Sequence, residues 1–117
     1  MEWAVEYYRD VKGGQPVRDF IHSLPDQAQA KVYRTIKLLK DYGVLLKEPY
    51  TKQIRGKIRE LRIADNKGAV RILYFTVTGR RLILLHGFIK KTDKIPEREI
   101  ETAEKRMFDF LEREEQR

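Results

Sequence analysis

Two arginines have the residue type and the spacing to hold an anion. Arg62 and Arg71 lie on either side of the turn-like sequence Asp-Asn-Lys-Gly at residues 65–68. A hairpin centred on that turn places the two arginines directly opposite each other, where like charges destabilise a sheet. This predicts either an anionic ligand between the guanidinium groups or a structural arrangement, in which both arginines point into solvent or pair with carboxylates such as Glu60. The register favours neither alternative.

The following strand adds an aromatic ring, an imidazole and a lysine to the same face. If residues 79–80, Gly-Arg, form a two-residue type II′ turn, Phe88 lies opposite Arg71, and His86 and Lys90 share that face of the sheet. Guanidinium groups bind phosphate through paired hydrogen bonds and stay charged at any working pH. Phe88 is suited to stack an unpaired base.

Together these side chains are suited to phosphodiester cleavage without a metal. In RNA the substrate's own 2′-hydroxyl can be the nucleophile, so the protein only has to orient it, take its proton and stabilise the crowded phosphate. Lys90 or Lys91 would neutralise a developing oxyanion. His86 is the first candidate for the proton by pKa, and Glu60 is a rival base. The alternative for His86 is a place at the edge of the core with one hydrogen bond.

Three strand candidates position these residues, at 58–64, 70–77 and 82–88. Residues 2–8 add a segment of strand-forming residue types with imperfect alternation. The pattern predicts an α+β fold with a small antiparallel sheet.

The pattern predicts a helical hairpin before the three strands. Pro16 opens a short helix whose apolar positions run to Leu24, and a longer helix after Pro25 ends at Gly43. A last helix begins at Pro96. We expect the hairpin to cover the apolar face of the sheet and to leave the basic face open. That apolar face carries Leu61, Ile63, Val70, Ile72, Tyr74, Ile83 and Leu85.

The composition is that of one basic domain spanning residues 1–117. The chain has 25 Lys and Arg against 18 Asp and Glu, a net charge of +7, and 41% of its residues are hydrophobic, enough to line a core at this length. Residues 51–91 hold 11 basic and 2 acidic side chains, a surplus of +9, which favours a surface that binds a polyanion. The alternative is a basic face that only keeps the protein soluble.

Several other classes are not expected from this sequence. The chain has no cysteine, and His22 and His86 do not form a metal-ligand spacing, so we expect no disulfide and no metal site. Phosphate-binding glycine loops and nucleophile elbows are absent, and we expect no cofactor. Residues 1–10 lack a signal-peptide pattern and no stretch has the length of a membrane span, which predicts a cytoplasmic protein away from membranes.

Three sequence blocks carry a resemblance to a known family. They are KIRELR at residues 57–62, RILYF at 71–75 and LLHGFIKKT at 84–92. Followed by Pro96 and a helix, they resemble the phage-derived HigB-like branch of the RelE/ParE toxin superfamily over roughly residues 50–106. The helical hairpin before them agrees in order with the fold of that family.

The resemblance implies the toxin of a type II toxin–antitoxin system. Such a toxin is an mRNA interferase, an endoribonuclease that cleaves mRNA in the ribosomal A site without a metal ion. Its partners would be mRNA on the ribosome and a small helix-turn-helix antitoxin similar to HigA.

The resemblance also implies roles for individual residues. Arg62 matches the arginine of the first block and Arg71 that of the second, and the third block supplies the remaining positions that face RNA in similar toxins. The proton-transfer residue is not fixed across the superfamily, so neither His86 nor Glu60 inherits that role. The catalytic candidates are Arg62, Arg71, Lys90, Lys91, His86 and Glu60. The RNA-binding candidates are Phe88, Lys52, Lys57 and Arg59.

Two other functions stay open from the sequence. ParE-like relatives share the fold but inhibit DNA gyrase, which would make this chain a protein-binding inhibitor. Arg62 and Arg71, together with Lys90 and Lys91, argue against that alternative because they are suited to RNA. The third possibility is a basic module that binds nucleic acid without catalysis.

Overall fold

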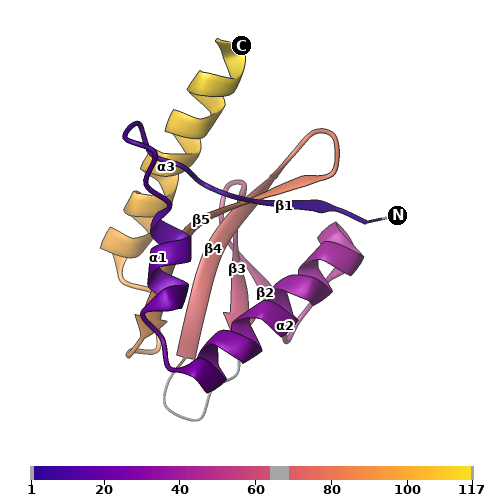
Figure 1. Cartoon of the computed structure of the whole chain (residues 1–117), viewed down its shortest axis with the longest axis vertical. Helices are drawn as coiled ribbons and strands as arrows, with labels where there is room; N and C mark the ends of the chain where they lie inside the picture. The colour runs from indigo at the N-terminus through magenta and orange to yellow at the C-terminus, as the bar shows by residue number, and fades with distance from the viewer. Residues whose placement is uncertain (1, 64–68, 117) are drawn as a thin grey trace.

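A five-stranded sheet forms the centre of the molecule (Figure 1). The computed structural model describes residues 2–63 and 69–116. The strands are β1 (Ala4–Tyr7), β2 (Thr51–Arg55), β3 (Ile58–Ile63), β4 (Ala69–Val77) and β5 (Arg81–Lys90). Their order is β1-β5-β4-β3-β2, in which β1 runs parallel to β5 and all other neighbours are antiparallel.

The predicted antiparallel sheet is wrong, because the sheet is mixed. Residues 2–8 do contain the strand β1, in which Ala4 pairs with Arg81 and Tyr7 with Leu84. Strands β2 to β5 follow one another directly, and such neighbours are antiparallel. Most of the chain separates β1 from β5, so no hairpin sets its direction, and residue alternation carries no information about direction.

In the part of the chain that the structure describes, three α-helices cover the two faces of the sheet. They are α1 (Pro16–His22), α2 (Asp26–Tyr42) and α3 (Glu97–Glu115), and a short 3₁₀ helix, η1 (Gly43–Leu45), follows α2. On one face α1 packs mainly against β5 and α2 mainly against β3, while α3 packs against β4 and β5 from the other face. None of the helices in the described part of the chain is both long and apolar enough to cross a membrane.

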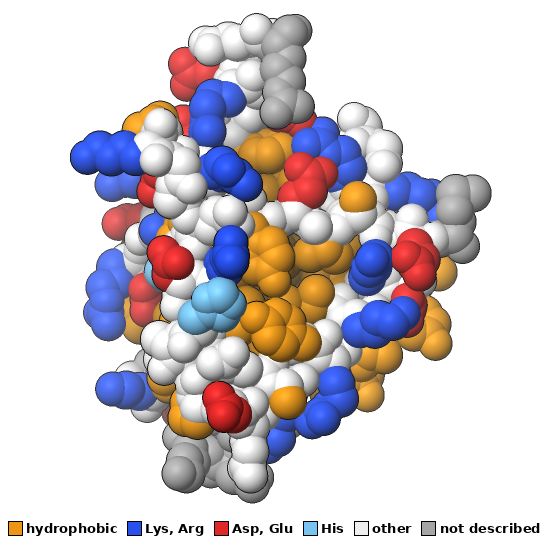
Figure 2. Space-filling view, in the orientation of Figure 1, with side chains coloured by type: hydrophobic (Ala, Val, Ile, Leu, Met, Phe, Trp, Pro, Cys, Tyr) orange, Lys and Arg blue, Asp and Glu red, His pale blue; other side chains and the backbone are white. Residues whose placement is uncertain are grey.

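The predicted helical hairpin is also wrong as a packing unit, because α1 and α2 each pack on the sheet more than on each other. Gly87 of β5 lets α1 come close, since a Cβ there would lie 2.3 Å from Cδ2 of Phe20. Figure 2 shows apolar side chains gathered between the two helices. The partly buried apolar residues that pack on the core of this side are Trp3, Val5, Tyr7, Phe20, Ile36 and Leu38.

The turn between β4 and β5 differs from the predicted type II′ turn. Gly79 and Arg80 have φ angles of +85° and +57°, whereas a type II′ turn has positive φ only at its first central residue. Val77 pairs with Arg81, so three residues form the loop instead of two. The other predicted turn, at residues 65–68, lies outside the described residues.

A β-bulge between residues 73 and 74 of β4 and their partners on β5 offsets the additional loop residue. On the far side of the bulge the predicted register holds, and Arg71 lies opposite Phe88. On the loop side the pairing is shifted by one, which turns Ile83 and Leu85 toward α3 instead of toward α1 and α2.

The sheet is therefore buried on both faces. Beneath α1 and α2 the strands contribute Leu61, Ile63, Val70, Ile72, Tyr74, Leu82 and Leu84. Beneath α3 they contribute Ile58, Leu73, Phe75, Ile83, Leu85 and Phe88, which pack with Ala103 and Met107 of the helix. The face predicted to stay open is thus covered by α3 across β4 and β5.

Candidate nucleic-acid interface

Glu60 lies between the two arginines. Arg62 pairs with Arg71 across β3 and β4, as predicted. Nε of Arg62 is 3.2 Å from Oε1 of Glu60, and Nε of Arg71 is 3.2 Å from Oε2. The Glu60 side chain is 1% exposed, against 28% for Arg62 and 12% for Arg71. We call these three residues the arginine clamp. Its single carboxylate holds two like charges side by side and leaves a net charge of +1.

The guanidinium groups of the clamp are not fully satisfied. Within the described residues, Nε of Arg62 and Nε of Arg71 are buried and lack a well-directed hydrogen bond. Nη1 of Arg71 donates to the carbonyl oxygen of Val70 at 3.1 Å. Burial lowers the pKa of Arg71; Glu60 opposes this shift and the charge of Arg62 adds to it. An anion at the clamp would favour the charged form of both arginines.

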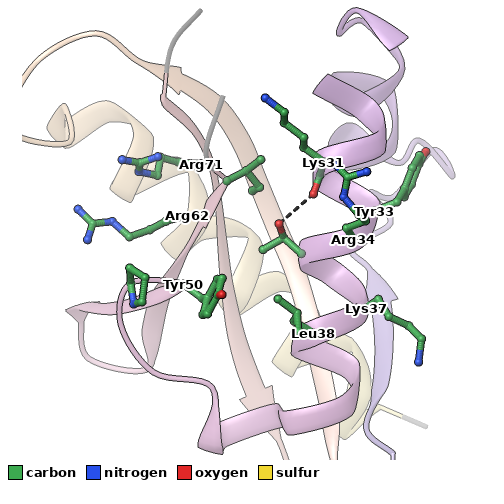
Figure 3. Close-up of a pocket in the computed structure, with 11 residues that line it drawn as sticks. Lys31, Tyr33, Arg34, Lys37, Leu38, Tyr50, Arg62 and Arg71 are labelled. Atoms are coloured by element: carbon green, nitrogen blue, oxygen red, sulfur yellow. Dashed lines mark hydrogen bonds between the residues drawn. The ribbon is translucent and has the colours of Figure 1, made fainter. Parts of the chain in front are cut away.

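An open groove of about 920 Å³ lies beside the clamp (Figure 3). In Figure 3, Arg62 and Arg71 extend side by side from neighbouring strands and away from α2, which lies across the groove. Because β2 pairs with β3 only as far as Leu61, Arg62 has β4 on one side and no paired strand on the other. The groove is lined by Lys31, Tyr33, Arg34, Thr35, Lys37, Leu38, Pro49, Tyr50, Arg62, Ile63 and Arg71.

The sequence patterns described above do not predict that residues of α2 line this groove. Counting charges by segment hides it, because residues 1–50 are almost neutral as a whole. A signal is nevertheless present, since Lys31, Arg34 and Leu38 stand at the i, i+3, i+7 positions of one helical face. This face adjoins the buried stripe, and it carries cations where the core stripe carries apolar residues.

His86 lies on the same face of the sheet as the arginine clamp, but both of its ring nitrogens already have hydrogen-bond partners. Nε2 is 2.9 Å from Oε1 of Glu99, and Nη1 of Arg106 donates to Nδ1 at 3.1 Å. A guanidinium can only donate, so Nδ1 is the acceptor and the proton of a neutral ring lies on Nε2. Burial lowers the pKa of His86; the hydrogen bond to Glu99 opposes the shift, and the charge of Arg106 adds to it.

Phe88 is packed inside the protein instead of being presented to solvent. Its side chain is 5% exposed and belongs to the core beneath α3. The ring stacks on His86 with centroids 5.6 Å apart and an interplanar angle of 20°. Stacking of a base on Phe88 would require this pair to separate.

Three predicted lysines lie at the edges of the clamp's face. Lys90 is on the same face of β4 and β5 as Arg71, close to the end of the strand, and Lys91 follows it in an exposed position. Lys52 lies opposite Glu60 on β2 and is exposed. All three are placed to extend a basic track from the clamp.

The remaining two RNA-binding candidates do not join the clamp. Arg59 faces the α2 side of the sheet, where it donates to Oγ1 of Thr51 at 3.1 Å and to Oε1 of Gln53 at 3.2 Å. Lys57 precedes β3 at the end away from Arg62, roughly 16 Å along the strand. In the described part of the chain, no three His, Asp or Glu side chains form a group that could hold a metal ion.

Comparison with known proteins identifies a family. The model of the family described as phage derived protein Gp49-like (DUF891) matches residues 19–108. This range covers α2, all strands from β2 to β5 and the first part of α3, so it includes the whole clamp and the groove. Comparison with curated proteins gives no match. The chain therefore belongs to the phage-derived Gp49-like family, a toxin-like family related to RelE.

Proposed function

We propose that this chain is the toxin of a type II toxin–antitoxin system, from the HigB-like branch of the RelE/ParE superfamily. Its proposed activity is cleavage of mRNA in the ribosomal A site by attack of the 2′-hydroxyl on the adjacent phosphate, without a metal ion. The observation that carries the proposal is the arginine clamp, in which a carboxylate that is 1% exposed holds two arginines at the edge of an open groove.

The clamp is suited to grip a phosphate whose charge increases during the reaction. Two guanidinium groups against one carboxylate leave a surplus cation, and the Arg62 side chain, which is 28% exposed, is accessible to a phosphate oxygen. Donors fixed in a partly buried site stabilise developing negative charge without reorganising. Arg62 and Arg71 therefore bind and stabilise the phosphate.

Glu60 and His86 act as positioning residues in this proposal. Glu60 is buried behind the arginines, and His86 has its acceptor nitrogen bonded to Arg106. Neither group reaches a substrate hydroxyl without breaking these contacts. On this face, we expect Lys90 at the strand end to handle the proton, because a guanidinium stays charged at any working pH.

The partners follow from the same proposal. The toxin acts in the cytoplasm on mRNA bound to the ribosome, away from membranes. A small helix-turn-helix antitoxin similar to HigA neutralises it, either by covering the basic face with acidic residues or by blocking entry to the ribosome through its bulk.

The test is to add the purified chain to translating ribosomes and to map new mRNA 5′ ends. New ends that appear with the wild-type protein, and not with Arg71→Ala, support the proposal. In parallel, the same preparation is added to DNA gyrase. Gyrase poisoning with intact mRNA would favour a ParE-like inhibitor, and RNA binding without either effect would favour a non-catalytic basic module.

A further inference from the structure

The groove along α2 and the charged ends of the clamp lie on opposite faces of the sheet. Arg71 lies opposite Phe88, whose side chain belongs to the core beneath α3, and Figure 3 shows Arg62 and Arg71 pointing away from α2. The groove is on the other face, where Ile63 belongs to the core beneath α2 and Leu38 packs against it. A ligand of the groove is therefore a different ligand from the phosphate at the clamp.

Apolar side chains line this groove and surround it. Leu38 of α2 and Tyr50 lie opposite one another in Figure 3, and the open space between the walls is about 920 Å³. Of the eight large hydrophobic side chains that are exposed in the described part of the chain, five belong to residues 33–50. Exposed apolar surface that is concentrated in one region marks a site of association. The five residues are Tyr33, Tyr42, Val44, Leu45 and Tyr50.

The charge around the groove is positive. Among the described residues, every charged side chain that lines it is a cation: Lys31, Arg34, Lys37, Arg62 and Arg71. This charge favours an acidic occupant. A second copy of the chain is a poor occupant, because each copy carries a net charge of +7 and the copies repel each other.

The α2 wall of the groove has the spacing that receives another helix. Lys31, Arg34, Thr35 and Leu38 line the groove from the i, i+3, i+4 and i+7 positions of one helical face. This face is two turns long, roughly 10 Å. Helices pack side by side through such ridges, and an amphipathic helix in a groove contributes apolar anchors at the same spacing.

We infer that this groove is the docking site for an acidic amphipathic helix of a partner protein. The apolar stripe of that helix packs on Leu38, Ile63 and Tyr50, and its carboxylates pair with Lys31 and Arg34. The inference goes beyond the proposed function, because it concerns the face opposite the clamp and holds whether or not the chain cuts mRNA. A docked helix covers Arg34, a cation that RNA could also contact, and leaves the clamp open.

The test measures the binding of three designed peptides to the full-length chain at equal salt, by fluorescence anisotropy. The first peptide has the length of α2, 17 residues, with leucines at i, i+3, i+4 and i+7 spacing and glutamates on the flanks. Serines replace the leucines in the second peptide, and lysines replace the glutamates in the third. The wild-type chain should bind the first peptide about 10-fold or more tightly than either control.

Variants assign this binding to the groove. Tyr50→Ala should weaken binding of the first peptide about 10-fold, because it removes an aromatic anchor. Its matched control is Phe108→Ala, since Phe108 is 61% exposed on α3. Arg34→Glu should weaken binding at least as much by reversing a charge, and its matched control is Lys105→Glu on the exposed face of α3. Thermal melting of each variant checks that the fold is retained.

The outcomes separate this inference from the proposed function. No binding of the first peptide, or equal binding of the first and second peptides, overturns the inference; equal binding would indicate a surface for any polyanion. Binding that persists in Tyr50→Ala and Arg34→Glu places the peptide elsewhere and also overturns it. Groove-dependent binding by a chain that cuts no mRNA supports the inference while the proposed cleavage fails.

Discussion

Two charged clusters lie on the same face of the sheet and differ in how much of their bonding capacity is used. In the arginine clamp, one buried carboxylate faces two guanidinium groups, and Nε of each arginine lacks a well-directed partner within the described residues. In the second cluster, His86 bonds to Glu99 through one ring nitrogen and to Arg106 through the other. We call it the histidine cluster.

The difference indicates that the clamp binds a ligand and that the histidine cluster has a structural role. The clamp stands at a sheet edge beside an open groove and carries a surplus cation. The histidine cluster joins β5 to α3 and has no surplus charge, with one carboxylate, one guanidinium and a neutral ring. Unsatisfied charge at an open site is suited to bind a ligand, whereas a satisfied and buried network holds structure.

The largest expected effect comes from removing one arm of the clamp. Arg71→Ala should lower the single-turnover rate of mRNA cleavage by about 10²–10³-fold, the usual effect of removing one donor to a developing oxyanion. It should also lower the stability of the fold, because buried Glu60 loses one of its two counter-charges. Rates are therefore normalised to the folded fraction measured by thermal melting. Full cleavage by folded Arg71→Ala would remove this arginine from the site.

Removing the carboxylate should mainly affect stability. Glu60→Gln leaves Arg62 and Arg71 opposed without a counter-charge, which should lower the free energy of unfolding by about 3 kcal/mol. Urea denaturation measures this loss. Glu97→Gln is the matched control, because Glu97 pairs with Arg55 at the surface with 57% and 43% of the side chains exposed. Equal losses in the two variants would contradict a structural role of the clamp.

The histidine cluster should respond to pH and not to RNA. Burial lowers the pKa of His86 from its ordinary value of 6.5, so below that pH the unfolded chain takes up a proton that the folded chain does not. Stability from this group is therefore complete above about pH 6.5 and falls as the pH decreases, by no more than about 1.4 kcal/mol per unit.

His86→Gln tests this pH dependence. Urea denaturation at about pH 7.5 and about pH 5.5 should show that the variant loses part of the wild-type decrease. His22→Gln, which changes an exposed histidine on α1, should keep the wild-type decrease. Cleavage per folded molecule should stay close to wild type in both variants. A cleavage rate that falls only in His86→Gln would return the proton-transfer role to the imidazole.

The smallest expected effect comes from Arg34, a cation that lines the groove. RNA affinity should fall with salt at a log–log slope of magnitude roughly 0.7 for each contacted phosphate. Arg34→Ala should reduce the magnitude of this slope by roughly 0.7, the contribution of one phosphate contact, because it removes one cation from the groove. Lys105→Ala, an exposed change on α3, should leave the slope unchanged. An unchanged slope in Arg34→Ala would place the RNA elsewhere.

The sequence is sufficient to predict the parts of the fold that depend on local patterns. The strands β3 to β5 and the apolar stripe of α3, with Ile100, Ala103 and Met107 buried, follow from alternation and helical spacing. The opposition of Arg62 and Arg71 follows from the turn-like sequence between them. The direction of β1 and the bulge in the β4–β5 pair depend on long-range packing, which local patterns do not contain.

The same limit applies to the candidate site. Arg62, Arg71 and Glu60 come from neighbouring strands, so pairing arguments bring them together. Arg34 and Tyr50 reach the groove from α2 and from the segment before β2, and only the packing of α2 on β3 places them there. The pairing pattern predicts that Phe88 contacts RNA, because it contains no sign that α3 covers that face of the sheet.

The claim that the two arginines act as one phosphate clamp is tested most directly by a double-mutant cycle. Single-turnover cleavage of ribosome-bound mRNA is measured for the wild type, Arg62→Ala, Arg71→Ala and the double variant, each normalised to its folded fraction. Residues that act as a unit on one phosphate are non-additive, so the double variant should be little slower than the slower single variant. Losses that multiply in the double variant, or a single variant with wild-type rate, would contradict the clamp.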